Sequence, residues 1–201
     1  MKKVLAITLV LALMFSLCGC ELLDSFTNFL TDVQTKLDEM AVEGTGKPGK
    51  VSENTLKFTD DGLVIMLTPD YVQKLPEGVT KESLAKEYQD AKESGLDYTY
   101  VYTFSGIFMV DDTPYAFAAD AKVDPEAENF GLIYTFPLKK EIAAKFMYEL
   151  KQGGEILGGL ILKHGNSEDS AYNAIDKFTI DSEKTGESNI VCKLVDTRTS
   201  K

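Results

Sequence analysis

Ser83 and Lys86 are separated by one helical turn within residues 81–93, whose apolar spacing predicts a helix. At this spacing a lysine amine can accept the proton of a serine hydroxyl, which is how an acyl-transfer nucleophile is activated. A Lys-Thr-Gly sequence follows at residues 184–186, where a strand could place it beside the serine. These residues form one candidate catalytic site.

The two motifs resemble the serine acyl-transferase pattern of penicillin-binding proteins and β-lactamases. The resemblance implies that Ser83 is a nucleophile and that Lys86 accepts its proton. The third motif of that pattern, Ser-x-Asn or Tyr-x-Asn, does not occur between them. Residues 184–186 also lie in a polar stretch typical of a turn. A solvated helix face and a loop are therefore the simpler interpretation.

A second group of candidate residues is aromatic. Tyr98, Tyr100, Tyr102 and Phe104 alternate with smaller residues, so a strand places all four on one face. This face is either part of the core, with each hydroxyl bonded or at the rim, or it binds a ligand or a protein. Three tyrosines are more polar than a closed core requires, and the binding hypothesis stays open for this reason.

His164 is the single histidine of the chain. It follows an apolar stretch and precedes Gly165-Asn166, which predicts an exposed loop position and no role as a general base. The sequence contains neither a Gly-x-Ser-x-Gly nor a His-Glu-x-x-His motif. Catalysis by carboxylates alone remains an alternative, because the chain has 32 acidic residues.

Carboxylates also suit calcium, and six of them are close together in the sequence. No Asp-x-Asp-x-Asp-Gly loop with a glutamate at its twelfth position occurs, so solvated turns are the simpler interpretation. We predict no metal and no cofactor. The six residues are Asp111, Asp112, Asp120, Asp124, Glu126 and Glu128.

The N-terminus has the pattern of an export signal. Lys2 and Lys3 precede an apolar run over residues 4–17, which is too short to span a bilayer comfortably. Leu17-Cys18-Gly19-Cys20 follows and resembles the lipobox of bacterial lipoprotein precursors. The resemblance implies cleavage before Cys20, a diacylglycerol group on its thiol, and anchoring on the extracytoplasmic face of the cell membrane. An ordinary signal peptide or an anchor helix is the alternative.

The rest of the chain divides by composition. Residues 1–19 are the expected signal peptide, residues 20–41 the lipidated cysteine with an amphipathic stem helix, residues 42–53 a linker, and residues 54–201 a globular domain. The apolar seam of the stem either packs on that domain or pairs with another helix, as in a self-associating stalk. The seam contains Leu23, Phe26, Leu30, Val33, Leu37 and Met40.

The globular part mixes strand and helix patterns. We expect a single α+β domain with a mainly antiparallel sheet and two or three helices packed on it, preceded by the amphipathic N-terminal helix. Thr80 is the expected N-cap of the first of these helices, Asp60-Asp61-Gly62 is expected to form a hairpin turn, and Ser105-Gly106 is expected to form a turn between two strands. The expected strands are 55–59, 63–67, 98–104, 107–110, 115–123, 131–136, 155–163, 178–181 and 188–195, and the expected helices are 81–93, 138–152 and 170–176.

Composition and charge exclude several classes. Hydrophobic residues make up 44% of the 201-residue chain, which is typical of a folded protein, and the net charge of −11 argues against nucleic-acid binding. Cys18 would leave with the signal and Cys20 would carry lipid, so no disulfide is expected. Cys192 alternates with apolar neighbours and is expected in the core.

Taken together, these patterns predict a lipid-anchored extracytoplasmic binding or adaptor protein without catalytic activity. Its partners would be the membrane, through Cys20, and a protein or small ligand at the face of Tyr98, Tyr100, Tyr102 and Phe104. The alternatives are a small envelope enzyme that uses carboxylates and a self-associating stalk protein.

Overall fold

A computed structural model describes residues 41–72, 75–76, 78–166, 170–181 and 190–199. The lipobox, Cys20 and the expected stem helix lie outside these residues. Most of the described chain belongs to one mixed β-sheet with helices at its ends, an α+β arrangement. None of the described helices is long and apolar enough to cross a bilayer.

The secondary structure comprises the following elements. The helices are α3 (Pro69–Val72), α4 (Lys81–Glu93) and α5 (Lys140–Lys151). The strands are β1 (Ala41–Glu43), β2 (Thr45–Gly49), β3 (Thr55–Thr59), β4 (Gly62–Leu67), β5 (Tyr98–Val110), β6 (Thr113–Lys122), β7 (Gly131–Pro137), β8 (Ile156–Asn166), β9 (Ser170–Asp181), β10 (Ile190–Val191) and β11 (Lys193–Asp196).

The sheet closes on itself through its last segment. Its strand order is β10-β9-β8-β5-β6-β2-β7-β4-β3-β11, with β1 paired to β6. The two ends of this order, β10 and β11, are separated in the chain by Cys192 alone. The first part of this segment, β10, pairs with β9, and the second part, β11, pairs with β3, both in parallel. We call this arrangement the rolled sheet.

The sheet was expected to be mainly antiparallel, and it is a mixed sheet that contains both antiparallel and parallel pairs. The long strands β5, β6 and β8 are antiparallel neighbours, as expected. Parallel pairs arise where two separate segments insert: β1 and β2 run beside β6, and the 190–196 segment runs beside β9 and β3. These insertions join residues far apart in the sequence, so a local pattern does not indicate them.

Residues 41–49 differ from the prediction. Residue 41 was expected at the end of the stem helix and residues 42–53 in a linker, but residues 41–49 form β1 and β2 between β6 and β7. The glycines permit close packing: a Cβ atom on Gly46 would lie 2.7 Å from ring carbons of Tyr134 and 2.8 Å from the Cβ atom of Ala121. Gly44 similarly faces the ring of Phe136.

Two further predictions were wrong. Ser105-Gly106 was expected to form a turn, but β5 is continuous because these residues pair with both β6 and β8. Gly106 is the small residue needed there, since a Cβ atom would lie 3.0 Å from the side chain of Ile156. The helix expected over residues 170–176 is part of β9, which pairs with β8 along its length.

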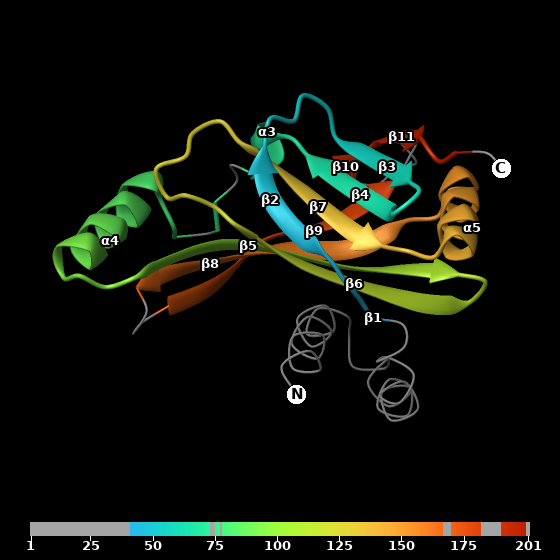
Figure 1. The fold of residues 1–201 in the computed structure, drawn as a ribbon. Coiled ribbons are helices and arrows are strands. Elements are labelled where there is room, and N and C mark those ends of the chain that lie inside the picture. Colours follow the sequence, from blue (N-terminus) through green and yellow to red (C-terminus); the bar gives the residue numbers. More distant parts are fainter. Residues whose placement is uncertain (1–40, 73–74, 77, 167–169, 182–189, 200–201) are drawn as a thin grey trace, which may run out of the picture.

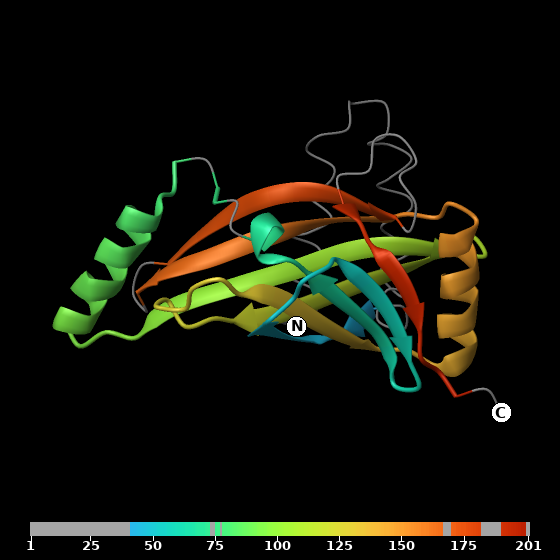
Figure 2. The ribbon, with the colours of Figure 1, turned by 90° about the horizontal axis from the view of Figure 1, so that it is seen from above.

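Several local predictions are confirmed. The hairpin across Asp60-Asp61-Gly62 forms, as β3 and β4. The helices expected over residues 81–93 and 138–152 form as α4 and α5, and Thr80 caps α4. Cys192 is fully buried, as expected. The helices α4 and α5 lie at opposite ends of the rolled sheet (Figures 1 and 2).

Aromatic side chains fill the interior between the two halves of the rolled sheet. Phe104 contacts Tyr134 and Phe136, with ring centroids 5.3 and 5.6 Å apart. Phe146 of α5 stacks on Phe108 at 3.8 Å and is fully buried. The α5 end is therefore packed with apolar side chains, and the α4 end is where an open site can form.

Candidate functional site

A cavity of about 620 Å³ lies at the α4 end of the rolled sheet. Three parts of the chain form its walls: the first residues of β5, the inner face of α4, and the 124–130 loop between β6 and β7. Its lining includes Tyr98, Tyr100 and Tyr102 from β5, Leu84, Ala85, Tyr88 and Gln89 from α4, and Glu126, Glu128 and Phe130 from the loop. A cavity of this size can hold a small organic molecule.

The aromatic face predicted from the sequence is divided between the cavity and the core. Tyr98 and Tyr100 are partly exposed and line the cavity. Tyr102 lines it as well but is only 2% exposed. Phe104 is fully buried and contacts the rings of the core. Phe104 is thus a core residue, and the structure brings only the three tyrosines together at the cavity.

The tyrosine hydroxyls are hydrogen-bonded within the protein. The hydroxyls of Tyr100 and Tyr102 lie 2.9 Å apart. Tyr98 donates to Oε2 of Glu87 at 3.2 Å. The fully buried Tyr134 donates to the carbonyl oxygen of Tyr102 at 3.0 Å. Tyr98, Tyr100 and Tyr102 together form what we call the tyrosine wall of the cavity. Hydrogen bonds of their own hydroxyl groups hold this wall in place.

Burial raises the pKa of the cavity tyrosines above the usual range for a phenol. It is the main cause for Tyr98, Tyr100 and Tyr102, because the phenolate would lose hydration. The negative charge of Glu87 raises the pKa of Tyr98 further. All three side chains are neutral near pH 7, so the wall offers rings and hydroxyls and no charge.

Glu87 connects α4 to the sheet, and the sequence analysis did not single it out. Its Oε2 atom lies 2.8 Å from Nδ1 of His164 and also accepts the hydrogen bond from Tyr98. His164 was predicted on an exposed loop, but it lies in β8 and is 5% exposed. The apolar stretch before it continues as a strand through Asn166, which explains the error. His164 thus faces inward and helps to position α4.

Ser83 has a structural role at the start of α4. Its hydroxyl accepts a hydrogen bond from the backbone N–H of Thr80 at 3.0 Å and donates one to the carbonyl oxygen of Thr80 at 2.9 Å. The hydroxyl of Thr80 accepts from the Ser83 N–H in return, forming a capping box. Lys86 is exposed on the same helix. Residues 184–186 lie outside the described residues, so the Lys-Thr-Gly part of the motif has no described position.

The acidic residues considered for calcium are spread over several local contacts. Asp111 forms an ion pair with Lys145. Asp120 accepts a hydrogen bond from Thr103, and Asp124 accepts one from the N–H of Glu126. In the described part of the chain, no group of three histidine, cysteine or acidic residues is placed to hold a metal ion.

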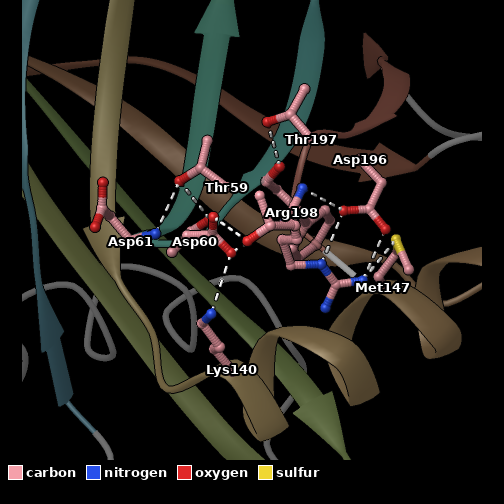
Figure 3. Close-up of polar contacts among 11 residues, drawn as sticks. Thr59, Asp60, Asp61, Lys140, Met147, Asp196, Thr197 and Arg198 are labelled. Atoms are coloured by element: carbon pink, nitrogen blue, oxygen red, sulfur yellow. Dashed lines mark hydrogen bonds and ion pairs between the residues drawn. The ribbon is translucent and has the colours of Figure 1, made fainter. Parts of the chain in front are cut away.

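A second polar cluster lies at the opposite end, where the C-terminal segment crosses the β3–β4 turn and α5 (Figure 3). Arg198 donates to both carboxylate oxygens of Asp196 at 2.8 Å, and its guanidinium lies 5.7 Å from the ring centroid of Phe58. Asp60 accepts from Thr199 and pairs with Lys140 at 3.3 Å. These contacts fasten the segment that closes the rolled sheet, so we assign the cluster a structural role.

Gly44, Gly46 and Gly49 have the spacing Gly-x-Gly-x-x-Gly that dinucleotide-binding loops use. Such a loop connects a strand to the start of a helix. Here Gly46 and Gly49 pair with β7 inside the sheet, and Gly44 donates to the carbonyl oxygen of Ala118. These glycines therefore serve sheet packing.

The sequence analysis missed the residues that turn the tyrosine face into a cavity. Tyr88 follows Leu84 by four residues on α4, a helical spacing that could have placed both on the inner face. Phe130 lies just before β7, and no local pattern indicates that it meets Tyr102 at 5.9 Å. No family model, curated protein or solved structure matches this chain. The functional argument therefore depends on this geometry.

Proposed function

We propose that this protein is a lipid-anchored, non-catalytic binding protein of the bacterial cell envelope, held on the outer face of the membrane through Cys20. The lipobox resemblance of residues 17–20 supports the anchor. The observation that supports ligand binding is the cavity, into which Tyr98, Tyr100 and Tyr102 project beside α4. A small organic molecule is the ligand we propose for it.

The position of the cavity favours binding. Phe146 and its neighbours fill the α5 end of the rolled sheet, while the α4 end has an opening of ligand size between a sheet, a helix and a loop. Aromatic walls with a few polar groups are typical of ligand sites. The hydrogen bonds among Tyr98, Tyr100, Tyr102 and Glu87 make the wall rigid before a ligand arrives, which lowers the entropy cost of binding.

The acyl-transfer hypothesis has less support than binding. Ser83 uses its hydroxyl in the capping box of α4, and Lys86 is exposed and is not among the residues that line the cavity. Glu126 and Glu128 line the cavity and keep open the carboxylate-enzyme alternative. Both lie on an exposed loop, where water competes with any substrate contact.

The anchor is tested by metabolic labelling of the full-length chain with an alkyne-bearing fatty acid in a bacterial host. We expect label on the wild-type protein and none on Cys20→Ala. Cys192→Ala is the matched control and should keep the label, because Cys192 is a buried core residue. Equal labelling of Cys20→Ala would contradict lipidation at this position.

Ligand binding is tested by thermal unfolding of the lipidated protein in detergent against amino acids, peptides, sugars, cell-wall fragments, and calcium with and without chelator. A ligand at a hundred times its Kd stabilises the fold by about 2.7 kcal/mol, which gives a measurable rise in Tm. Tyr100→Leu should abolish the rise, and Thr99→Ala, on the other face of β5, should retain it. A flat panel, or a rise that survives Tyr100→Leu, would count against the proposed cavity site.

A further inference from the structure

Aromatic rings meet at steep angles around the cavity. Tyr100 and Tyr102 have ring planes 82° apart, and Tyr102 and Phe130 have planes 71° apart. Tyr88 and Tyr98 meet at 65°. Their centroids are separated by 5.4 to 5.9 Å. At these angles the rings meet edge to face and do not stack, so the lining of the cavity presents both ring edges and ring faces.

The charges around the cavity are mostly negative. Glu126 and Glu128 line the cavity against a single lysine, Lys81, among the lining residues. Glu87 adds a carboxylate directly behind Tyr98. The whole chain carries a net charge of −11. An anionic ligand would be repelled from this end of the molecule, and a cation would be attracted.

The hydroxyls contribute less to ligand recognition than the rings. The Tyr98 hydroxyl donates a hydrogen bond to Glu87, and the hydroxyls of Tyr100 and Tyr102 bond to each other. A sugar or another neutral polar ligand needs free, directed donors and acceptors. The main surface that these residues offer is therefore aromatic, with a negative electrostatic potential over the ring faces.

We infer that the cavity binds an organic cation, an ammonium group carrying apolar substituents, with the partly exposed rings of Tyr98, Tyr100 and Phe130 around the charged group and Glu126 and Glu128 nearby. This inference rests on the proposed binding function and specifies its ligand class. Cation–π contact with several desolvated rings is the general way in which proteins recognise such ligands. Lys92 already lies 5.5 Å from the ring centroid of Tyr88, so one lining ring holds a cation within the fold.

The cavity of about 620 Å³ exceeds the volume of a trimethylammonium group. The natural ligand would therefore carry a larger body beside the cation. Leu84 and Leu75 line the cavity and provide apolar contact for that body.

The experiment compares two probes of equal shape. Choline and 3,3-dimethyl-1-butanol differ in having a quaternary nitrogen or a carbon at the same position, so they differ in charge alone. The chain has no tryptophan, and tyrosine fluorescence of the full lipidated protein can report binding directly. We expect choline to bind at least about tenfold more tightly than the alcohol, as cation–π contact predicts.

Two variants and their controls locate the site. Tyr100→Leu keeps apolar volume and should weaken choline binding about tenfold, whereas Tyr148→Leu, at an exposed tyrosine of α5, should not. Glu128 lies on an exposed loop and lines the cavity. Glu128→Gln should weaken choline binding severalfold without changing Tm. Glu141→Gln, on α5, is its matched control.

The outcomes separate the two proposals. Equal binding of both probes, with loss in Tyr100→Leu, would overturn the cation inference and leave the cavity as a ligand site. No binding of either probe would also overturn it, while the thermal-unfolding panel tests the wider binding function independently. Choline binding unaffected by both cavity variants would show that the cation binds elsewhere and would overturn the inference as well.

Discussion

The Nδ1 atom of His164 lies 2.8 Å from the Oε2 atom of Glu87, and this contact joins β8 to α4 beside the cavity. The histidine side chain is 7% exposed and the glutamate side chain 41% exposed. One carboxylate thus bonds a buried histidine and the hydroxyl of Tyr98. Because α4 carries one wall of the cavity, the position of that wall depends on Glu87.

Glu87→Ala should lower the free energy of unfolding by about 1 to 2 kcal/mol. The substitution removes the acceptor of Tyr98 and the carboxylate partner of the buried His164. Lys86→Ala, at an exposed position on the same helix, should change stability by less than about 0.5 kcal/mol. Urea unfolding of both variants measures the difference, and equal values would show that the Glu87 contacts do not hold α4.

Gly46→Ala should destabilise the fold by about 2 kcal/mol through overpacking. Its new methyl group would lie 2.7 Å from the buried ring of Tyr134 and 2.8 Å from Ala121. Gly49→Ala is the matched control on the same strand. Its methyl group would meet the Cδ1 atom of Ile133, the flexible end of a side chain that can move aside. In thermal unfolding, the Tm of Gly46→Ala should be well below that of Gly49→Ala. The opposite order of the two Tm values would contradict the packing of β2 against β7.

The C-terminal segment that closes the rolled sheet, residues 190–199, should be held less firmly in acid. Hydrogen bonds from Arg198 lower the pKa of Asp196 to about 2. A carboxyl group whose pKa is lower in the fold stabilises it above the unfolded pKa of about 4, and this contribution is lost as pH falls toward 2. The effect is modest because the Asp196 side chain is 39% exposed and solvent screens the pair.

Unfolding midpoints measured between pH 5 and pH 2 provide the test for Asp196. Asp196→Asn should be less stable than wild type at pH 5, and the gap should narrow toward pH 2. Asp97→Asn, at an exposed position, is the control and should follow wild type. A gap that stays constant with pH would show that the charge of Asp196 does not contribute.

The tyrosine wall should make the fold sensitive to alkali. Burial raises the pKa values of Tyr98, Tyr100, Tyr102 and Tyr134 in the folded protein. Stability from these groups is complete below the unfolded phenol pKa of about 10 and is lost as pH rises above it. Phenolate absorbance should therefore show a group of tyrosines that ionise only as the protein unfolds.

Tyr100→Phe should reduce the loss of stability above pH 10, because it removes one phenol of raised pKa. Tyr148→Phe is the control, since Tyr148 is 62% exposed. If all nine tyrosines of the wild-type chain titrated together near pH 10 without unfolding, the buried wall would be contradicted.

The local elements of this fold could be predicted because their signals are contained in short windows. Thr80 and Ser83 form the cap of α4 within four residues, and Asp60-Asp61-Gly62 forms the turn between β3 and β4. The alternation of Tyr98, Tyr100 and Tyr102 likewise gave their common face correctly. In each case the interacting groups are neighbours in the chain.

The failed predictions share the opposite property. Ser105 and Gly106 have turn-forming types, yet pairing with two flanking strands keeps β5 extended. His164 was placed on a loop because Gly165-Asn166 follows it, although β8 continues through both residues. Both stretches take part in the pairing of β5 with β8, two strands that are far apart in the sequence, and this pairing outweighs weak local preferences.

The sequence by itself determined the α+β composition, the acidic charge, the capped helix and the shared face of three tyrosines, because each follows from residue types and spacing. Only the tertiary structure decided whether those tyrosines would pack in the core or line a cavity. Phe146 fills one end of the rolled sheet, and Tyr88 and Phe130 line an opening at the other. That difference depends on which distant segments meet at each end, and packing between distant segments is not encoded in any single window of the chain.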